Sequence, residues 1–97
     1  MQRRRYLVAY DIRDPERLRA VARVMVASGN RIQYSVFLAD LDRKEVSALK
    51  VALEALIDRS ADTVVFVNLG AATGGRSSNV AWLGQMPTIS WVPPLVV

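Results

Sequence analysis

The sequence predicts an α+β fold, a ferredoxin-like βαββαβ sandwich with an additional C-terminal strand. The chain has 97 residues, a length that suits one domain. Two amphipathic helical patterns alternate with extended apolar stretches, in the order strand, helix, one or two strands, helix, strand, strand. This spacing fits two helices on one face of an antiparallel sheet. We expect a single domain over residues 1–97, with its core over about 1–83 and a C-terminal edge strand or tail over about 84–97.

The first strand and the first helix follow from short local signals. Residues 5–12 have mostly apolar side chains on both alternating sets, which is typical of a strand covered on both faces. Asp14 suits a helix N-cap, and Pro15 suits the first helical position. Gly29 and Asn30 predict the end of this helix. Its apolar face is formed by Leu18, Val21, Ala22 and Met25.

The middle of the chain is predicted to be extended and then helical. Residues 31–41 are long for one strand, and a bend near residues 33–35 would make them two short strands. Asp42 and Glu45 have the spacing of a capping box, which predicts the start of the second helix. We expect that helix to end near residues 58–60. Its apolar face is formed by Val46, Leu49, Leu53, Leu56 and Ile57.

The last third of the chain predicts a strand, a loop and an apolar end. Residues 63–69 form an apolar run that is typical of a strand covered on both faces. Residues 70–78 contain Gly and Ser and predict a flexible loop. Residues 79–83 are expected to form another short strand, and residues 86–97 an apolar tail.

Two of the predicted strands would present an apolar face that the helices leave uncovered. Two helices cover only one face of a sheet, yet residues 6–12 and 63–69 are apolar on both faces. An exposed apolar face of that size would be a liability. We therefore expect a symmetric homodimer packed sheet to sheet, with the uncharged tail covering an edge or crossing to the partner.

The composition excludes several classes of site. The chain has no cysteine and no histidine, so a disulfide framework, a structural zinc site and a histidine-based catalytic triad are all excluded. An enzyme of this composition would have to use carboxylates, hydroxyls, Arg, Lys, Tyr or a metal held by oxygen. We find no membrane span or signal peptide in the sequence, and we expect a cytoplasmic protein.

Positive charge is concentrated near the beginning of the chain. Residues 1–31 carry eight arginines, no lysine and only three acids, whereas the whole chain has a net charge of +4. Arginine presents a planar fork of donors that matches phosphate, which favours binding to a nucleic-acid backbone. The alternative is a solvated, salt-bridged surface. The candidate nucleic-acid-binding residues are Arg13, Arg17, Arg19, Arg23 and Arg31.

Asp11 is the residue that fits the strand pattern least. It ends the first strand on the face shared by Leu7 and Ala9, where a carboxylate is costly unless something satisfies it. It could accept backbone N–H groups of the turn, or pair with Arg13 or Arg17. In a dimer, a two-fold axis near Asp11 would bring two carboxylates together, and Mg²⁺ is often held by one or two carboxylates together with substrate phosphates.

Several segments together resemble the CRISPR-associated protein 2 family, the small partner of the CRISPR integrase in spacer acquisition. The resemblance covers nearly the whole chain. The Y-D-I signature at residues 10–12 combined with R-x-Q-x-S-V-F at residues 31–37 is fairly specific. The matching segments are residues 6–12, 14–15, 17–18, 29, 31–37, 67–69 and 80–84, together with the capped second helix.

The resemblance implies a ferredoxin-like homodimer and a Mg²⁺-dependent endonuclease that acts on single-stranded RNA or double-stranded DNA. In that family, the aspartate at the position of Asp11 lies at the dimer interface in each chain and binds the metal. Arg17, Arg31 and Ser35 are on recurrent family positions near this site. Family members also hold two CRISPR integrase dimers apart and bind the DNA backbone between them.

We therefore predict a homodimeric, Mg²⁺-dependent phosphodiesterase of CRISPR adaptation that acts on RNA, DNA or both. Asp11 is expected to bind the metal, while Tyr10 or Ser35 orients water or phosphate. The alternative is a non-catalytic DNA-binding scaffold that bridges integrase dimers. A ribonuclease toxin of the same fold is a further enzyme candidate, and a regulatory dimer for a small ligand is disfavoured by the arginine excess. Tyr10 and Tyr34 could stack on bases, although packing in the core is favoured for both.

Overall fold

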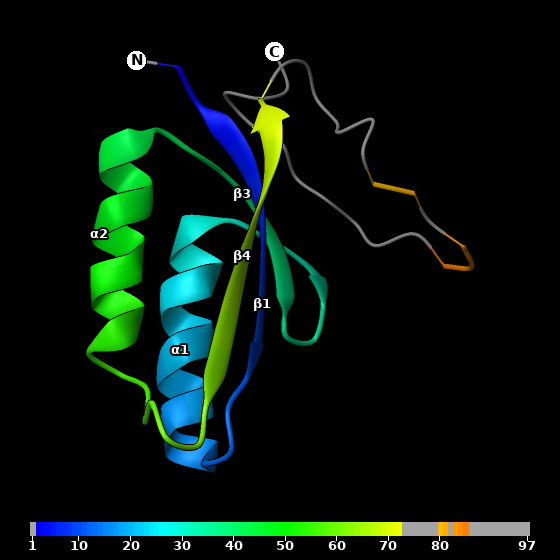
Figure 1. Ribbon diagram of the computed structural model, residues 1–97. Coiled ribbons are helices and arrows are strands. Elements are labelled where there is room, and N and C mark those ends of the chain that lie inside the picture. Colours follow the sequence, from blue (N-terminus) through cyan, green and yellow to red (C-terminus); the bar gives the residue numbers. More distant parts are fainter. Residues whose placement is uncertain (1, 73–79, 82, 86–97) are drawn as a thin grey trace.

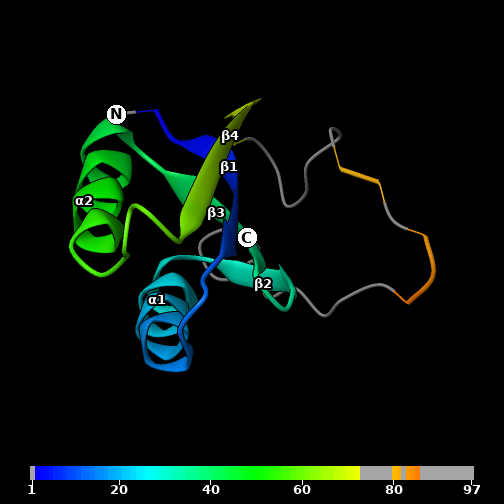
Figure 2. The ribbon, with the colours of Figure 1, turned by 60° about the horizontal axis from the view of Figure 1, so that its bottom comes forward.

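Four strands form one antiparallel sheet, and both helices cover the same face of it (Figures 1 and 2). The computed structural model describes residues 2–72, 80, 81 and 83–85. The strands lie in the order β2-β3-β1-β4, which together with the helices confirms the predicted α+β, ferredoxin-like arrangement. The elements are β1 (Arg4–Asp11), α1 (Pro15–Ser28), β2 (Asn30–Gln33), β3 (Val36–Leu41), α2 (Arg43–Glu54) and β4 (Thr63–Ala71).

Both helices begin where the sequence predicts. The Asp14 side chain accepts a hydrogen bond from the Arg17 backbone N–H at 2.9 Å. Asp42 and Glu45 form the predicted capping box, because each side chain accepts the other's backbone N–H, at 2.8 and 2.9 Å. The predicted end of α2 near residues 58–60 is wrong. The helix ends at Glu54, where the chain tightens into a turn from which Leu56 and Ile57 still pack on the core.

Gly29 ends α1 as predicted, but for a different reason. Its φ of −165° is extended, so its backbone does not need glycine. What requires glycine is the close approach of β3. A Cβ atom at position 29 would collide with the Leu38 carbonyl oxygen and lie 2.8 Å from the Ala39 Cβ. The missing side chain therefore lets the end of α1 lie directly against the sheet.

The extended stretch at residues 31–41 is a hairpin, as the predicted bend indicated. β2 and β3 are joined by a turn at Tyr34 and Ser35, and their register shifts between Arg31 and Gln33. The Tyr10 backbone N–H donates a hydrogen bond to the Ser35 carbonyl oxygen at 3.1 Å. This bond fixes the turn beside the end of β1, so the two lie at the same end of the sheet (Figure 1).

The core lies between the helices and the sheet. Tyr10 packs there against Phe37, with ring centroids 6.1 Å apart. The buried residues of this layer are Val8, Tyr10, Ile12, Val21, Met25, Phe37, Ala39, Leu41, Val46, Leu49 and Leu53.

The other face of the sheet, which we call the outer face, is apolar along its middle. Leu7 pairs with Val67 and Ala9 with Val65, so these four side chains share that face. Val65 and Val67 are 47% and 41% exposed. The second apolar face that the sequence predicts for β1 and β4 is therefore present, and part of it is open.

The outer face ends in a buried ion pair at the start of β1. Arg5 lies opposite Asp40 of β3, and its guanidinium donates to both carboxylate oxygens, at 2.7 and 2.8 Å. Both side chains are almost fully buried. Asp11 lies at the far end of the same strand, six residues beyond Arg5. At about 3.3 Å per residue, the outer face therefore has one ionic group at each end, roughly 20 Å apart.

The C-terminal strand predicted at residues 79–83 is not observed in its described part. Val80, Ala81 and Leu83 belong to no strand, because they pair with none of the four strands described. Asn79, Trp82 and the predicted apolar tail at residues 86–97 lie outside the described residues. Neither described helix, of 14 and 12 residues, is long and apolar enough to cross a bilayer.

Candidate functional site

Asp11 lies at the end of the outer face, where β1 stops. It pairs with Thr63 at the start of β4, and its side chain is 70% exposed. Its one ionic contact among the described residues is with Arg13, at 3.8 Å. A long contact between two exposed groups adds little to stability, so it does not explain why a carboxylate ends this strand. The carboxylate oxygens of Asp11 are available to a ligand.

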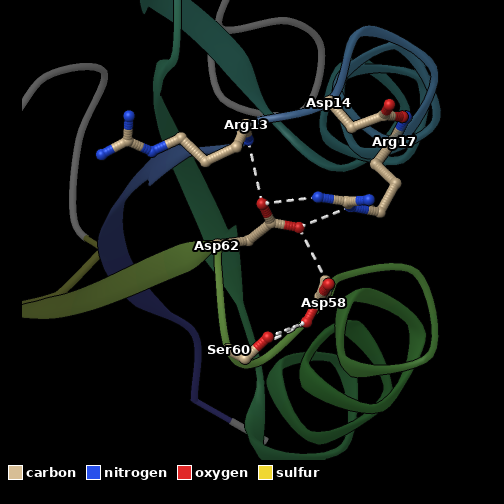
Figure 3. Close-up of polar contacts among 6 residues, drawn as sticks. All are labelled: Arg13, Asp14, Arg17, Asp58, Ser60 and Asp62. Atoms are coloured by element: carbon tan, nitrogen blue, oxygen red, sulfur yellow. Dashed lines mark hydrogen bonds and ion pairs between the residues drawn. The ribbon is translucent and has the colours of Figure 1, made fainter.

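A second aspartate, Asp62, precedes Thr63, the residue that pairs with Asp11, and forms the centre of a buried network (Figure 3). Its side chain is fully buried at the end of the loop that leads into β4. It accepts the backbone N–H groups of Arg13 and Asp58, at 2.9 and 2.8 Å. It also accepts two guanidinium N–H groups of Arg17, at 2.7 and 3.1 Å. Asp62 therefore ties the β1–α1 loop, α1 and the loop before β4 together.

These contacts set the charges of the network. Hydrogen bonds from the Arg17 guanidinium, assisted by the two backbone N–H groups, hold the pKa of Asp62 well below its ordinary value, although burial acts in the opposite direction. The same bond raises the pKa of Arg17. Asp58 accepts the backbone N–H and the hydroxyl of Ser60, which lowers the pKa of Asp58. The network is ionised, and Asp62 accepts hydrogen bonds from the β1–α1 loop, from α1 and from the loop before β4, so it holds these segments together.

The predicted arginines fall into different places. Arg17 is engaged by Asp62, as Figure 3 shows, so two of its donors are already used. Arg13 extends an exposed side chain near Asp11. Arg19 and Arg23 are exposed on α1, on the helix side of the sheet, and neither has an ion pair within the described part of the chain.

The remaining candidates lie around the hairpin turn. The Arg31 guanidinium carbon lies 5.8 Å from the ring centroid of Tyr34 and 5.0 Å from that of Phe37. Ser35 is partly buried in the turn, where its carbonyl accepts the Tyr10 N–H. The Tyr10 ring lies on the helix side, in the core, and its hydroxyl has no hydrogen-bond partner among the residues that the structure describes. The structure therefore brings Arg13 to Asp11 and directs the Tyr10 hydroxyl away from it.

Sequence reasoning missed Asp62. It lies just before a predicted strand, so the only signal in the sequence is an acidic residue in the loop between the second helix and that strand. Its partner Arg17 is 45 residues away, so only the folded chain shows that they meet.

A divalent cation would find one free carboxylate at this end of the sheet, among the residues described. The described residues contain no group of three or more acids that could hold one within a single chain. The oxygens of Asp62 are already used by four N–H donors. Asp11 is exposed and available, so one chain supplies one carboxylate. That fits a Mg²⁺ ion shared between two copies of the chain, completed by water and substrate phosphate.

The chain resembles known proteins over this whole fold. Residues 4–76, which contain all six elements, match the model of the family described as CRISPR associated protein Cas2. A Cas2 endoribonuclease of Rhodospirillum rubrum is 46% identical over 67 residues, which is 69% of this chain and 66% of that protein. A second one from the same organism is 36% identical over 94% of this chain and 98% of its own. The crystal structure of a hypothetical protein from Thermus thermophilus, TT1823, has a TM-score of 0.73 and 31% identity. That match covers 91% of this chain and 99% of the solved one.

Proposed function

Because the chain belongs to the CRISPR-associated Cas2 family, we propose that it is a homodimeric, Mg²⁺-dependent nuclease of CRISPR spacer acquisition. The observation that carries this proposal is the exposed carboxylate of Asp11 at the end of an incompletely covered apolar sheet face. Relatives named as Cas2 endoribonucleases support a nuclease activity.

The dimer follows from the outer face. Leu7, Ala9, Val65 and Val67 are partly exposed there, and burial of apolar surface favours association. Two copies that pack through this face would be related by a two-fold axis, so each patch would meet its own equivalent. An axis that passes near the end of β1 would bring the two Asp11 carboxylates together.

The two Asp11 carboxylates would hold the cation between them. When bound, Mg²⁺ supplies a Lewis acid for a phosphate oxygen and makes a bound water more acidic. The residues of the chain supply the rest. Arg13 lies near Asp11, with an exposed guanidinium that can bind a neighbouring phosphate. The Asp62 network keeps the loop that carries Arg13 fixed, which preorganises the position of the substrate.

A second function is favoured by a separate observation. Arg19 and Arg23 lie one helical turn apart on α1, exposed and away from Asp11. Such a pair can bind the phosphates of a duplex without any cleavage. This arrangement supports the alternative in which the dimer is a DNA-binding scaffold between CRISPR integrase dimers. Both functions are compatible in one protein.

The test is a cleavage assay with Mg²⁺ on labelled single-stranded RNA and double-stranded DNA. We expect the wild type to cleave and Asp11→Asn to lose activity by at least about a hundredfold. Glu16→Gln, which removes an exposed acid from α1, serves as the matched control and should keep full activity. Light scattering must show that all three proteins are dimers.

Equal cleavage by the wild type and Asp11→Asn would contradict the catalytic proposal and indicate a contaminating nuclease. No cleavage by any of the three, together with binding to duplex DNA, would support the scaffold. A monomeric wild type at micromolar concentration would contradict the dimer.

A further inference from the structure

Tyr34 is placed differently from every other large aromatic residue described. It lies in the turn between β2 and β3 and is 74% exposed, whereas Tyr10 is buried and Tyr6 and Phe66 are partly buried. Core packing, which the sequence favoured for both Tyr10 and Tyr34, is confirmed for Tyr10 and wrong for Tyr34. An exposed tyrosine is ordinary by itself, so its surroundings decide what it can do.

The Tyr34 ring is contacted by the guanidinium of Arg31. The Arg31 guanidinium lies 5.8 Å from the Tyr34 ring centroid and 5.0 Å from that of Phe37, which is fully buried. Arg31 therefore connects the exposed ring to the core through two cation–π contacts. A ring that is already ordered loses less conformational freedom when a ligand binds.

The turn also places the backbone of Tyr34 at the same end of the sheet as Asp11, while Arg31, which contacts the Tyr34 ring, lies with Phe37 on the helix side. Ala9 pairs with Val36, and the Tyr10 N–H donates to the Ser35 carbonyl, so the turn lies next to the last two residues of β1. Neighbouring strands are about 4.8 Å apart. The backbones of Tyr34 and Asp11 are therefore on the order of 10 Å apart or less, close enough for one bound strand to contact both.

We propose that Tyr34, supported by Arg31, is a stacking platform for an unpaired nucleobase, and that it holds a single strand of nucleic acid at the end of the sheet where Asp11 lies. Every base has a flat π face that stacks on an aromatic ring, and arginine adds attraction for the adjacent phosphate. In a duplex those faces are covered by neighbouring base pairs, so the platform selects single-stranded RNA or DNA. This inference rests on the proposed function, because it specifies the substrate of the same site.

The surroundings of Tyr34 fit a nucleic acid better than a protein partner. The exposed apolar side chains of the sheet, Val65 and Val67, are on β4, at one edge of the sheet. Tyr34 lies in the turn between β2 and β3, which form the opposite edge. Its exposed neighbours in the hairpin are Arg31 and Gln33, which are polar. The ring is therefore separate from the apolar patch that would bury against a second copy.

The first experiment measures binding of the full-length protein to fluorescent oligonucleotides of one sequence, as single-stranded RNA, single-stranded DNA and duplex DNA. Tyr34→Ala is expected to weaken binding to both single strands by about 5- to 150-fold and to leave binding to the duplex unchanged. Tyr34→Phe keeps the ring and should bind like the wild type. Gln33→Ala, the exposed neighbour in the hairpin, is the matched control and should also be unchanged.

A second readout reports stacking directly. A 2-aminopurine base in the single strand should lose fluorescence when it binds the wild type and Tyr34→Phe, and should keep it with Tyr34→Ala. If cleavage is present, Tyr34→Ala should raise KM with little change in kcat, because it removes binding that is common to the ground state and the transition state.

The proposal is overturned if Tyr34→Ala binds single strands like the wild type, or weakens duplex binding equally. It is also overturned if Tyr34→Ala loses the dimer and regains single-strand affinity at concentrations where the dimer forms, since Tyr34 would then be a contact between copies. Absence of cleavage in every variant would contradict the nuclease activity alone, because the affinity and 2-aminopurine readouts do not depend on it.

Discussion

Tyr10 and Asp11 are adjacent in the chain, yet their side chains lie on opposite faces of the sheet. The Tyr10 ring packs in the core against Phe37, and the Asp11 carboxylate is open to solvent. This follows from the alternation of side chains along a strand. Two neighbouring residues of the Y-D-I signature therefore have different environments, one in the core and one in solvent, and different experiments test their roles.

We expect Tyr10→Phe to be at least as stable as the wild type. The Tyr10 hydroxyl is buried and has no hydrogen-bond partner in the described part of the chain, and such a group costs about 1–3 kcal/mol. Removing it should raise the free energy of unfolding by about 1 kcal/mol, measured by urea denaturation. Cleavage should be unchanged. A folded Tyr10→Phe protein that has lost cleavage would instead support the catalytic role that the sequence suggested for this hydroxyl.

We expect stability to fall in acid, in part because of Asp62. The Arg17 guanidinium lowers the pKa of Asp62 in the folded state, so the unfolded chain takes up a proton first as the pH drops. The resulting stability is present above the ordinary carboxyl pKa of 3.8 and is lost as the pH falls toward the folded value. Thermal unfolding should therefore show a falling Tm below about pH 5.

Asp62→Asn tests whether Asp62 causes this acid dependence. It should lower the Tm at pH 7 by on the order of 10 °C, and its Tm should depend less on pH below about 5. Glu16→Gln provides the control, because Glu16 is exposed and outside the network. An Asp62→Asn protein with the same acid dependence as the wild type would show that other carboxylates cause the effect.

Gly29→Ala should destabilise the protein by about 1–3 kcal/mol, even though the extended backbone at Gly29 is open to any residue. The added methyl group would meet the Leu38 carbonyl oxygen and the Ala39 Cβ of β3. Denaturant titration measures the change, and Ala27→Ser, two residues earlier, is the control because Ala27 is exposed and the added atom meets solvent. A Gly29→Ala protein as stable as the wild type would mean that β3 and α1 can separate without cost.

The double variant Arg19→Ala/Arg23→Ala tests the scaffold function. It should weaken duplex DNA binding about tenfold or more at low salt, and should reduce the slope of log affinity against log salt by about two. Cleavage of a short single strand should be retained, since both residues lie on the helix side of the sheet. Arg59→Ala is the control, because Arg59 is already paired with Glu54. An unchanged salt slope would exclude α1 as a phosphate-binding surface.

The sequence predicts best what is decided locally. Asp14 and the pair Asp42–Glu45 begin their helices as expected, because a cap depends on residues three positions apart. Asp11 was recognised because a carboxylate interrupts an apolar alternation, which is also a local signal. The family resemblance then added a role to that residue.

What escaped prediction depends on contacts between distant segments. The sequence predicts Arg17 as a phosphate ligand because it does not show that Asp62, 45 residues later, binds the same guanidinium. Tyr34 was expected in the core because residues 31–41 alternate like strands, and only the turn exposes it. The roles of Asp11 and Ser35 stay predictions, as do the binding of Mg²⁺ and the dimer.

The buried pair between Arg5 and Asp40 has a consequence for how the sheet assembles. Because side chains alternate along a strand, sliding β3 by one residue past β1 would move Asp40 to the helix side, away from Arg5. A buried carboxylate would then lie in the apolar layer without its partner, at high cost. The pair therefore discriminates against misaligned strands during folding, a task that the apolar residues around it perform poorly because one aliphatic neighbour can replace another.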